Sequence, residues 1–249
     1  MGTMEELEQV IRSGRYEEAR SRILAGEEGD ADGLAVLLEL RDWLRLKEYG
    51  KAQKLLEQDG DLIAGYLDVP QAKAAIEAFD QEDESKIAAY LDHPHLGAEA
   101  WAALGLVRIR SGNREEARKA FDTALLADPG HYRVKTNLAN LTLEAGQTDE
   151  AIRMYEEVLK LNPEYPLAHH NLGAAYRKKG QIDKSVYHIK RGQRLQMRPA
   201  TRPPRSVVPG AAAPLPLPER RPLLGSFGNR WWLWLLVIVV AYWLLNRQP

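Results

Sequence analysis

The sequence predicts an all-α protein: an α-solenoid of antiparallel helix pairs, then a proline-rich linker and a single C-terminal transmembrane helix. Three observations lead to this prediction. Gly112, Gly146 and Gly180 recur at intervals of 34 residues, and a fixed period of this length is typical of a repeat array. Residues 198–222 contain eight of the chain's fourteen prolines. Residues 231–245 form an apolar run without a charged residue.

Each period of the array predicts two helices joined by a glycine turn. Gly112 ends the first helix, and Ala117, Phe121 and Ala124 then share the inner face of the second. The small residues let the two helices approach closely, and the aromatic ring fills the space beside them. Asp128-Pro129 ends the second helix, because proline disfavours a helical conformation in the residue before it. The spacing predicts three repeats within residues 97–197: 98–131, 132–165 and 166–197.

These residues resemble the tetratricopeptide repeat. The resemblance rests on Trp101 to Gly105 before the turn and on the Ala, Phe, Ala and Pro positions after it. It extends over residues 98–197, and the third copy departs from the pattern with Ser185 for Ala and Met197 for Pro. The resemblance implies that the first helices line a concave groove, which in this family commonly receives a peptide or a partner helix.

Residues 1–96 are predicted to be a degenerate helical region of the same kind. Ser13 to Ala19 matches the inter-helix turn and the helix after it, and Lys47 to Ala52 matches them again. The pattern weakens after residue 61, although 70–79 and 82–91 still predict helices. Two interpretations remain open, a divergent end of the array and a separate partner surface. We favour a continuing array of five or six helix pairs that share one core.

The groove candidates are polar residues of the first helices. Asn137 and Asn171 occupy equivalent positions, where related arrays often bind the backbone of an extended ligand; Ala103 stands there in the preceding repeat. The other candidates on this face are Arg110, Arg133, Asn140, His170, Arg177 and Lys178. This net basic set favours an acidic or extended segment of a protein partner, and the alternative is a set of solvated helix faces. The family's carboxylate clamp is missing, since Ala102, Leu106 and Leu167 replace its polar residues.

No enzyme, cofactor or metal site is predicted. The chain has no cysteine, which excludes disulfides and thiolate chemistry. His93-Pro94-His95 lies in an inter-helix turn without an assured third ligand. No phosphate-binding loop or nucleophile elbow is present. Basic stripes with interleaved aromatic residues are also missing, so nucleic acid is not an expected partner.

Charge is distributed unevenly along the chain. Residues 1–95 contain 11 Lys/Arg and 22 Asp/Glu, whereas residues 198–249 contain 7 and 1. The proline-rich segment, residues 198–229, cannot form a packed core and is predicted to be a disordered, semi-rigid spacer. Its arginines approach the apolar run and suit an anionic lipid surface.

Residues 230–246 predict a transmembrane tail anchor, and the bilayer is therefore an expected partner. The fifteen apolar residues span about 22 Å as a helix, against a hydrocarbon core of about 30 Å. Flanking arginines and terminal aromatic residues compensate for this short length: Arg230, Trp231, Trp232, Trp234, Trp243 and Arg247. The excess of arginine before the run places the repeats in the cytoplasm, and the composition suggests a bacterial inner membrane.

Two functions fit these features. The first is a membrane-anchored scaffold or adaptor whose cytosolic array binds a segment of a partner protein in its groove. The alternative is a structural or assembly subunit of a stable membrane protein complex. A third possibility is that the apolar tail folds back into the groove when it is off the membrane. The sequence leaves the partner's identity and the oligomeric state open.

Overall fold

The computed structural model describes residues 2–197, with side chains from Glu5 onward. Contacts divide the chain into two units, Met1–Pro209 and Gly210–Pro249, and the described residues belong to the first. The linker predicted over residues 198–229 and the anchor predicted over residues 230–246 lie outside the described residues. Between residues 2 and 197, no helix is long and apolar enough to cross a membrane.

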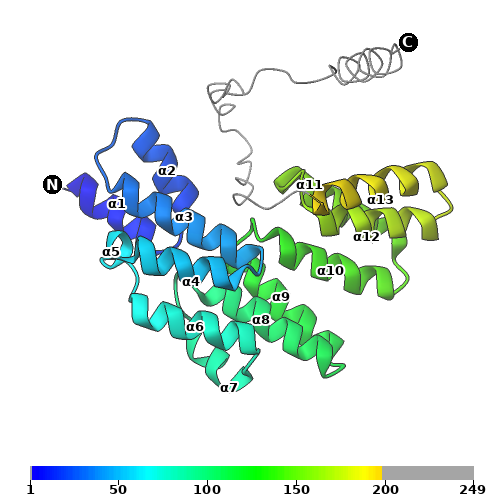
Figure 1. Cartoon of the computed structure of the whole chain (residues 1–249), viewed down its shortest axis with the longest axis horizontal. Helices are drawn as coiled ribbons and strands as arrows, with labels where there is room; N and C mark the ends of the chain where they lie inside the picture. The colour runs from blue at the N-terminus through cyan, green and yellow to red at the C-terminus, as the bar shows by residue number, and fades with distance from the viewer. Residues whose placement is uncertain (1, 198–249) are drawn as a thin grey trace, which may run out of the picture. The chain divides into compact units, whose positions relative to one another are not determined.

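Every regular element of the described region is helical (Figure 1). The N-terminal helices are α1 (Gly2–Arg12), α2 (Tyr16–Leu24), α3 (Ala31–Arg45), α4 (Tyr49–Gln58), α5 (Gly60–Ile63), α6 (Val69–Gln81), α7 (Glu84–Ile87) and the 3₁₀ turn η1 (Ala88–Tyr90). The later helices are α8 (Gly97–Arg110), α9 (Arg114–Ala127), α10 (Tyr132–Glu144), α11 (Thr148–Leu161), α12 (Pro166–Lys178) and α13 (Ile182–Gln196). The predicted all-α class is confirmed for this part of the chain.

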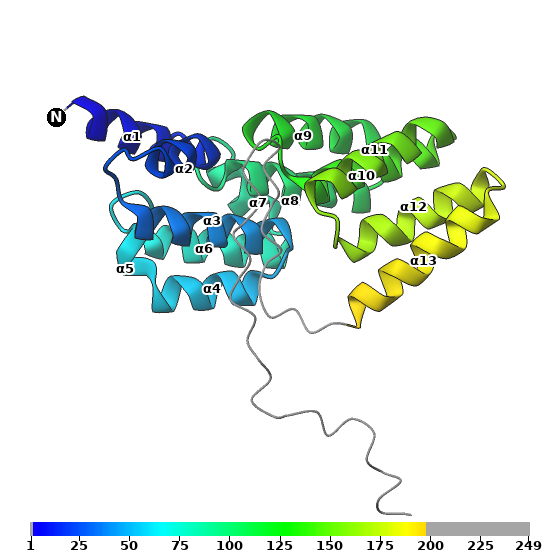
Figure 2. The ribbon, with the colours of Figure 1, turned by 90° about the horizontal axis from the view of Figure 1, so that it is seen from above.

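Helices that are consecutive in sequence lie side by side in space. Figures 1 and 2 show α8 against α9, α10 against α11, and α12 against α13. Contacts of α9 with α10 and of α11 with α12 connect each pair to the next. The described region is therefore a row of helix pairs in which each pair packs mainly on its sequence neighbours, as in solenoid arrays.

The turns inside the pairs have the same backbone geometry throughout the described region. Gly112, Gly146 and Gly180 have φ values of 78°, 86° and 81°. Gly14 has the same left-handed conformation at 77°, and Lys47 (60°) and Glu82 (52°) adopt it without being glycine. Left-handed backbone is costly for residues with a Cβ atom. The N-terminal region therefore keeps the turn geometry of the repeats, with glycine at Gly14 but not at the turns of Lys47 and Glu82.

Ion pairs connect the two non-glycine turns. Lys47 Nζ lies 2.8 Å from Glu82 Oε1, and Arg110 at the end of α8 also pairs with Glu82. The carboxylate of Glu82 is nearly buried, with 5% of its side chain exposed. The strained turn residues thus contribute contacts between neighbouring helix pairs.

The helix that follows α6 differs from the expectation. Residues 82–91 were expected to form one helix, and the structure has the four-residue α7 followed by η1. The helix expected over residues 70–79 is α6, and Asp68 caps its start, where the carboxylate accepts a hydrogen bond from Gln71 N at 2.7 Å. The short α5 was not predicted.

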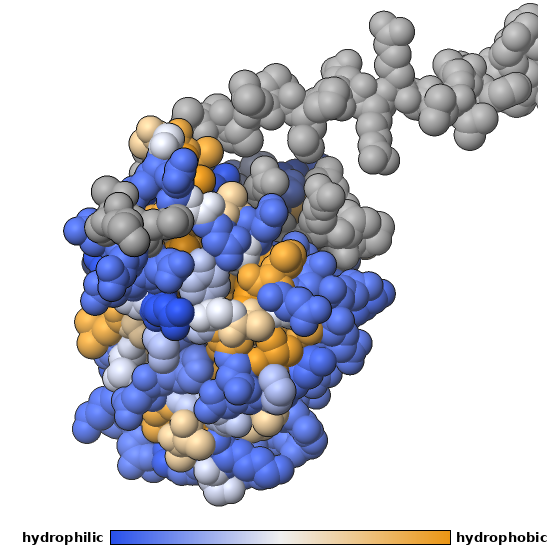
Figure 3. Space-filling model, turned by 90° about the vertical axis from the view of Figure 1, so that its left-hand side faces the viewer, coloured by the Kyte–Doolittle hydropathy of each residue, from blue (hydrophilic) through white to orange (hydrophobic). Residues whose placement is uncertain are grey.

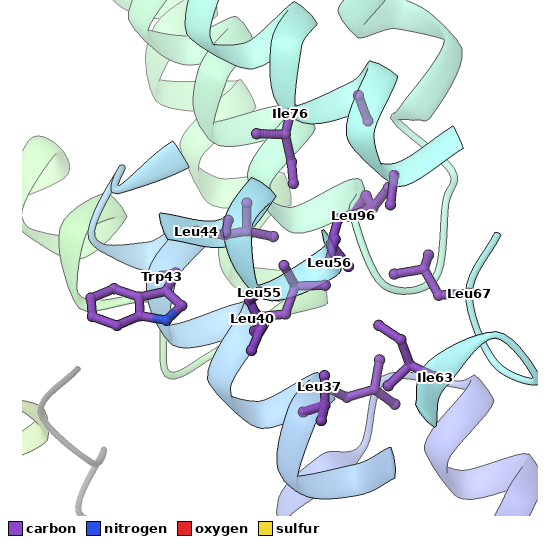
Figure 4. Close-up of a cluster of buried hydrophobic side chains, with 14 of the residues drawn as sticks. Leu37, Leu40, Trp43, Leu44, Leu55, Leu56, Ile63, Leu67, Ile76 and Leu96 are labelled. Atoms are coloured by element: carbon purple, nitrogen blue, oxygen red, sulfur yellow. The ribbon is translucent and has the colours of Figure 1, made fainter. Parts of the chain in front are cut away.

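One hydrophobic core runs from α1 to α8. Figure 4 shows side chains of α3, α4, α5 and α6 directed toward one another, including Leu37, Leu56 and Ile76, with Leu96 beside them. Ala100 and Ala103 of α8 belong to the same cluster. No gap in packing separates residues 1–96 from the first repeat. This continuity supports the interpretation that the array continues into the N-terminal region.

The N-terminal side of the unit is largely polar on its surface. Figure 3 views this side, and hydrophilic residues cover most of it, with smaller apolar areas between them. The acidic composition of residues 1–95 therefore belongs to a solvated surface over a closed core.

Candidate partner-binding surface

The three candidate asparagines lie on consecutive first helices. Asn137 and Asn140 belong to α10, and Asn171 belongs to α12. Asn140 Oδ1 accepts two hydrogen bonds, one from the Tyr155 hydroxyl at 2.6 Å and one from Asn171 Nδ2 at 2.8 Å. The structure therefore brings Asn140 and Asn171 together across the boundary between two repeats, and the amide of Asn171 is already engaged.

Asn137 differs from its equivalent in the next repeat. Its Nδ2 atom is buried, and it has no hydrogen-bond partner among the described residues. A buried polar group without a partner costs about 1–3 kcal/mol. This amide is therefore an unused donor on the face that the sequence assigned to ligand binding.

Three of the candidate basic residues belong to α12. His170, Arg177 and Lys178 are exposed on α12. The Nζ atom of Lys178 donates to the Leu143 carbonyl at 3.0 Å, which connects α12 to α10. The positive charge of the candidate surface therefore comes mainly from the C-terminal end of α12.

The other two candidate arginines are paired within the protein. Arg110 is exposed, but its guanidinium contacts Glu82. Arg133 was expected on the ligand-binding face, and the structure instead leaves it only 6% exposed. Its Nε donates to the Arg45 carbonyl at 3.1 Å, and its Nη2 pairs with Glu99. The expectation that Arg133 faces a ligand is therefore wrong, because a buried charge requires an internal partner.

Arg133 belongs to a buried polar network that sequence reasoning missed. Glu99 accepts a hydrogen bond from the Tyr49 hydroxyl at 2.5 Å, and His131 Nε2 lies 3.1 Å from its other oxygen. Burial raises the pKa of Glu99, but the charge of Arg133 and the hydrogen bond from His131 outweigh this effect and lower it overall. Glu99 is therefore an ionised carboxylate inside the protein.

A second buried ion pair lies beside it. Arg45 is 2% exposed, and it donates two hydrogen bonds to Asp128, from Nε at 2.7 Å and from Nη2 at 2.5 Å. Burial acts to raise the pKa of Asp128, yet the charge and hydrogen bonds of Arg45 hold it well below its usual range. Together the two ion pairs connect α3 to the start of α10, which joins the N-terminal region to the repeats.

The histidines contribute to structure in three places. His93 Nδ1 accepts the backbone N–H groups of His95 and Leu96 just before α8. His95 Nδ1 lies 2.5 Å from the Tyr16 hydroxyl, and His169 contacts His188 at 3.0 Å. Within residues 2–197, no group of three or more His, Cys, Asp or Glu side chains could hold a metal ion.

His95 predicts a loss of stability in mild acid. Burial, with the neighbouring His93, lowers its pKa to about 4, below the unfolded value of about 6.5. Its contribution is complete above pH 6.5 and is lost as pH falls toward 4. Asp42 opposes this trend, because burial raises its pKa to about 6. We expect His95 to account for about 1–2 kcal/mol of lost unfolding free energy between pH 7 and pH 5.

Urea denaturation at both pH values measures this effect. His95→Gln should show a smaller loss between pH 7 and pH 5 than the wild-type chain. His170→Gln, at an exposed position on α12, is the matched control and should behave like the wild type. An unchanged pH dependence in His95→Gln would contradict the assignment.

The candidate surface is not a deep pocket. Three hollows of the described region have volumes of about 460, 430 and 290 Å³, and no groove candidate lines any of them. An open helical face of this kind suits an extended protein segment better than a small molecule.

Comparison with known proteins agrees with the helix-pair architecture. Residues 98–131 match the family model described as "Tetratricopeptide repeat", and residues 139–186 match "TPR repeat". No curated protein matches the chain.

Several solved structures of MamA are similar to the chain. "Crystal structure of MamA" is 18% identical, covers 59% of this chain and 88% of its own, and has a TM-score of 0.42. "Crystal structure of MamA protein" is also 18% identical, with coverages of 65% and 91% and a TM-score of 0.42. The predicted repeats are confirmed over the matched residues by the family models: the chain contains tetratricopeptide repeats at residues 98–131 and 139–186.

Proposed function

We propose that the protein is a membrane-anchored adaptor whose repeats bind an extended segment of a partner protein along α10 and α12. The repeats support a role in protein binding. Residues 230–246 hold the chain in a membrane, with the array on the cytoplasmic side. The role is one of binding rather than catalysis, and any chemistry belongs to the bound partner.

The unpaired amide of Asn137 carries the binding proposal. Its Nδ2 atom is buried and has no hydrogen-bond partner in the described region, whereas Asn140 and Asn171 satisfy each other. An extended peptide presents backbone carbonyl groups that can accept from this donor once the amide of the partly exposed Asn137 side chain rotates toward the surface. Binding then removes the cost of the unpaired group and adds a hydrogen bond.

The exposed cations among the candidates lie at one end of the surface. We therefore limit the proposed preference for an acidic partner segment to that end. Arg110 and Arg133 are neutralised by Glu82 and Glu99, which leaves Arg177 and Lys178 as the exposed cations among the candidates. We expect an acidic side chain of the ligand to lie near the C-terminal end of α12, with neutral residues beside Asn137.

Asn137→Ala is expected to weaken partner binding about tenfold, because one buried hydrogen bond to the ligand is worth about 1–1.5 kcal/mol. The measurement is capture of partners by the full chain in detergent micelles, followed by titration with the captured segment. Asn113→Ala, at an exposed position between α8 and α9, is the matched control and should bind as the wild type does. Equal affinity of Asn137→Ala and the wild type would contradict the groove assignment.

Membrane anchoring has a separate test. The full chain should remain with membranes after alkaline carbonate extraction, and deletion of residues 230–246 should release it. Native mass measurement in detergent then distinguishes the adaptor from a permanent assembly subunit. A single protomer supports the adaptor, and a fixed multi-protein complex supports the alternative.

A further inference from the structure

One face of α13, at the edge of the row of helices, is exposed (Figure 2). Ile182 and Val186 are 57% and 44% exposed, and Lys190 and Gln193 are exposed as well. A rotation of about 100° per residue places these four side chains within about 80° of one another around the helix axis. We call these four residues the α13 outer face.

The repeat period shows what such a face contacts inside the array. The residues 34 positions earlier belong to α11, and they are Thr148, Ile152, Glu156 and Leu159. Ile152 is only 7% exposed, and it shares a cluster with Leu172 and Ala175 of α12. Val186 occupies the equivalent position on α13, and no described helix follows α13. The α13 outer face therefore corresponds to the surface of α11 that receives the next helix.

Two polar contacts show how α12 is aligned on α11. The Tyr176 hydroxyl donates to Glu156 Oε1 at 2.6 Å, and Lys179 Nζ lies 2.5 Å from Asp149 Oδ1. The C-terminal end of α12 thus lies beside the start of α11, and the two helices run antiparallel. A helix that continues the row on α13 would have the same alignment.

The equivalent positions of α13 carry a different charge pattern. Asp183 keeps the charge of Asp149, whereas Lys190 replaces Glu156. Lys190 and Arg194, one turn later, are exposed, and neither forms an ion pair within residues 2–197. The complement of this surface is therefore a helix with a carboxylate opposite Lys190, where α12 has a hydroxyl group on α11.

We propose that the α13 outer face binds an amphipathic helix of a partner protein, which places an apolar stripe on Ile182 and Val186 and a carboxylate opposite Lys190. The bound helix runs antiparallel to α13 and extends the row of helices by one. This surface is separate from the proposed groove on α10 and α12, so the proposal does not depend on Asn137 or on the membrane anchor.

A second copy of the chain matches this face less well. A two-fold contact between two α13 helices would bring Lys190 and Arg194 of both copies onto one interface, where like charges repel. The helix at the opposite end of the row, α1, exposes Glu5, Glu6 and Glu8. It supplies carboxylates without the apolar stripe that Ile182 and Val186 require.

A charge exchange tests the proposed contact. The probe is a fluorescent peptide with the sequence of residues 166–181, which contains the α12 surface that packs on α11, and with the substitution Tyr176→Glu. Its dissociation constant is measured with the full chain in detergent micelles. We expect Lys190→Glu in the chain to weaken binding about fivefold. A second peptide with Tyr176→Lys should show the reverse preference and bind the Lys190→Glu chain about fivefold more tightly than the wild type.

Matched variants on α9 control for general changes of charge and hydropathy. Val186→Asp should weaken the Tyr176→Glu peptide at least about tenfold, because it places a charge in the apolar contact. Leu126→Asp, at a residue that is 83% exposed, should bind as the wild type does. Lys119→Glu, at an exposed lysine, is the corresponding control for Lys190→Glu. The helical circular dichroism signal checks that all four variants remain folded.

Four outcomes would overturn the proposal. Equal weakening by Val186→Asp and Leu126→Asp would place the peptide elsewhere, and equal effects of Lys190→Glu on the two peptides would remove the charge contact. The other two outcomes use a polarity-sensitive dye on Gln193→Cys, since the chain has no cysteine of its own. A dye response to vesicles of phosphatidylcholine and phosphatidylglycerol, without one to the peptide, would assign the face to a lipid surface. A response to protein concentration alone would assign it to a second copy.

Discussion

Replacing Glu99 with alanine is expected to destabilise the protein by about 3–5 kcal/mol, because removal of one partner leaves a buried charge uncompensated. Glu99 is 3% exposed and contacts Tyr49, His131 and Arg133. Without it, the Arg133 guanidinium retains only the Arg45 carbonyl among these partners. Urea denaturation of the wild type and the variant at pH 7 measures the loss.

Two further variants make this prediction specific. Glu150→Ala removes the carboxylate of an exposed pair with Arg153, whose side chains are 47% and 67% exposed. Exposed pairs contribute little, so a change below about 1 kcal/mol is expected. Glu99→Gln keeps the shape of the side chain and one acceptor oxygen. Its loss of unfolding free energy should fall between those of Glu99→Ala and Glu150→Ala. A loss below about 1 kcal/mol in Glu99→Ala would show that the network does not stabilise the junction.

The position of this network determines which helices lose protection from hydrogen exchange when Glu99 is replaced. Arg45 lies at the end of α3, and its partner Asp128 lies between α9 and α10. The network thus connects residues far apart in sequence in a fold whose other contacts are mostly between neighbouring helices. We expect Glu99→Ala to increase hydrogen exchange in α3 and α10 together, while α12 and α13 retain more protection.

The sequence predicted the repeats well where a residue type follows directly from backbone geometry. Glycine marks the left-handed turns at Gly112, Gly146 and Gly180, and the period is therefore visible in the printed chain. In the N-terminal region the same turns carry Lys47 and Glu82. A charged residue gives no turn signal, so these pairs could be predicted only from weaker helical patterns.

The buried network was missed, although the sequence contains a signal for it. Glu99 and Arg133 are 34 residues apart, and they therefore occupy equivalent positions on consecutive first helices, where side chains of opposite charge can meet. Sequence reasoning assigned Arg133 to the groove because it was expected on the same helix face as Asn137. The repeat period indicates which residues are neighbours, but it does not predict whether they are buried. The burial of Arg133 depends on its contact with Arg45, and Arg45 has no repeat equivalent among the candidate residues.

The sequence identified the asparagines of the first helices, but it did not predict which of them form a hydrogen bond, for a related reason. Asn137 and Asn171 are equivalent in sequence, yet the hydrogen bond runs between Asn140 and Asn171. Asn140 of α10 is the acceptor for Asn171, and the residue 34 positions before Asn140 is Leu106. By the repeat period, the position that would accept from Asn137 therefore carries an apolar side chain.

Replacing Phe121 with alanine is expected to cost about 3–5 kcal/mol, through lost burial and the cavity that remains. Phe121 is fully buried and fills the space between α8 and α9. Its ring lies against Gly105, where a Cβ atom would be 2.3 Å from Cε1 of the ring. Urea denaturation monitored by the helical circular dichroism signal measures the change, and a loss below about 1 kcal/mol would contradict it.

Two further variants test the contact between Gly105 and Phe121, one by overfilling it and one by making room for the added group. Gly105→Ala adds the clashing methyl group and should cost about 1–3 kcal/mol through overpacking. Combined with Phe121→Leu, the added methyl group gains room, so the double variant should lose less than the sum of the two single changes. The second repeat carries Ala139 with Tyr155 at the equivalent positions, both fully buried. Close approach at this position therefore depends on how the small and large residues are paired, rather than on glycine alone.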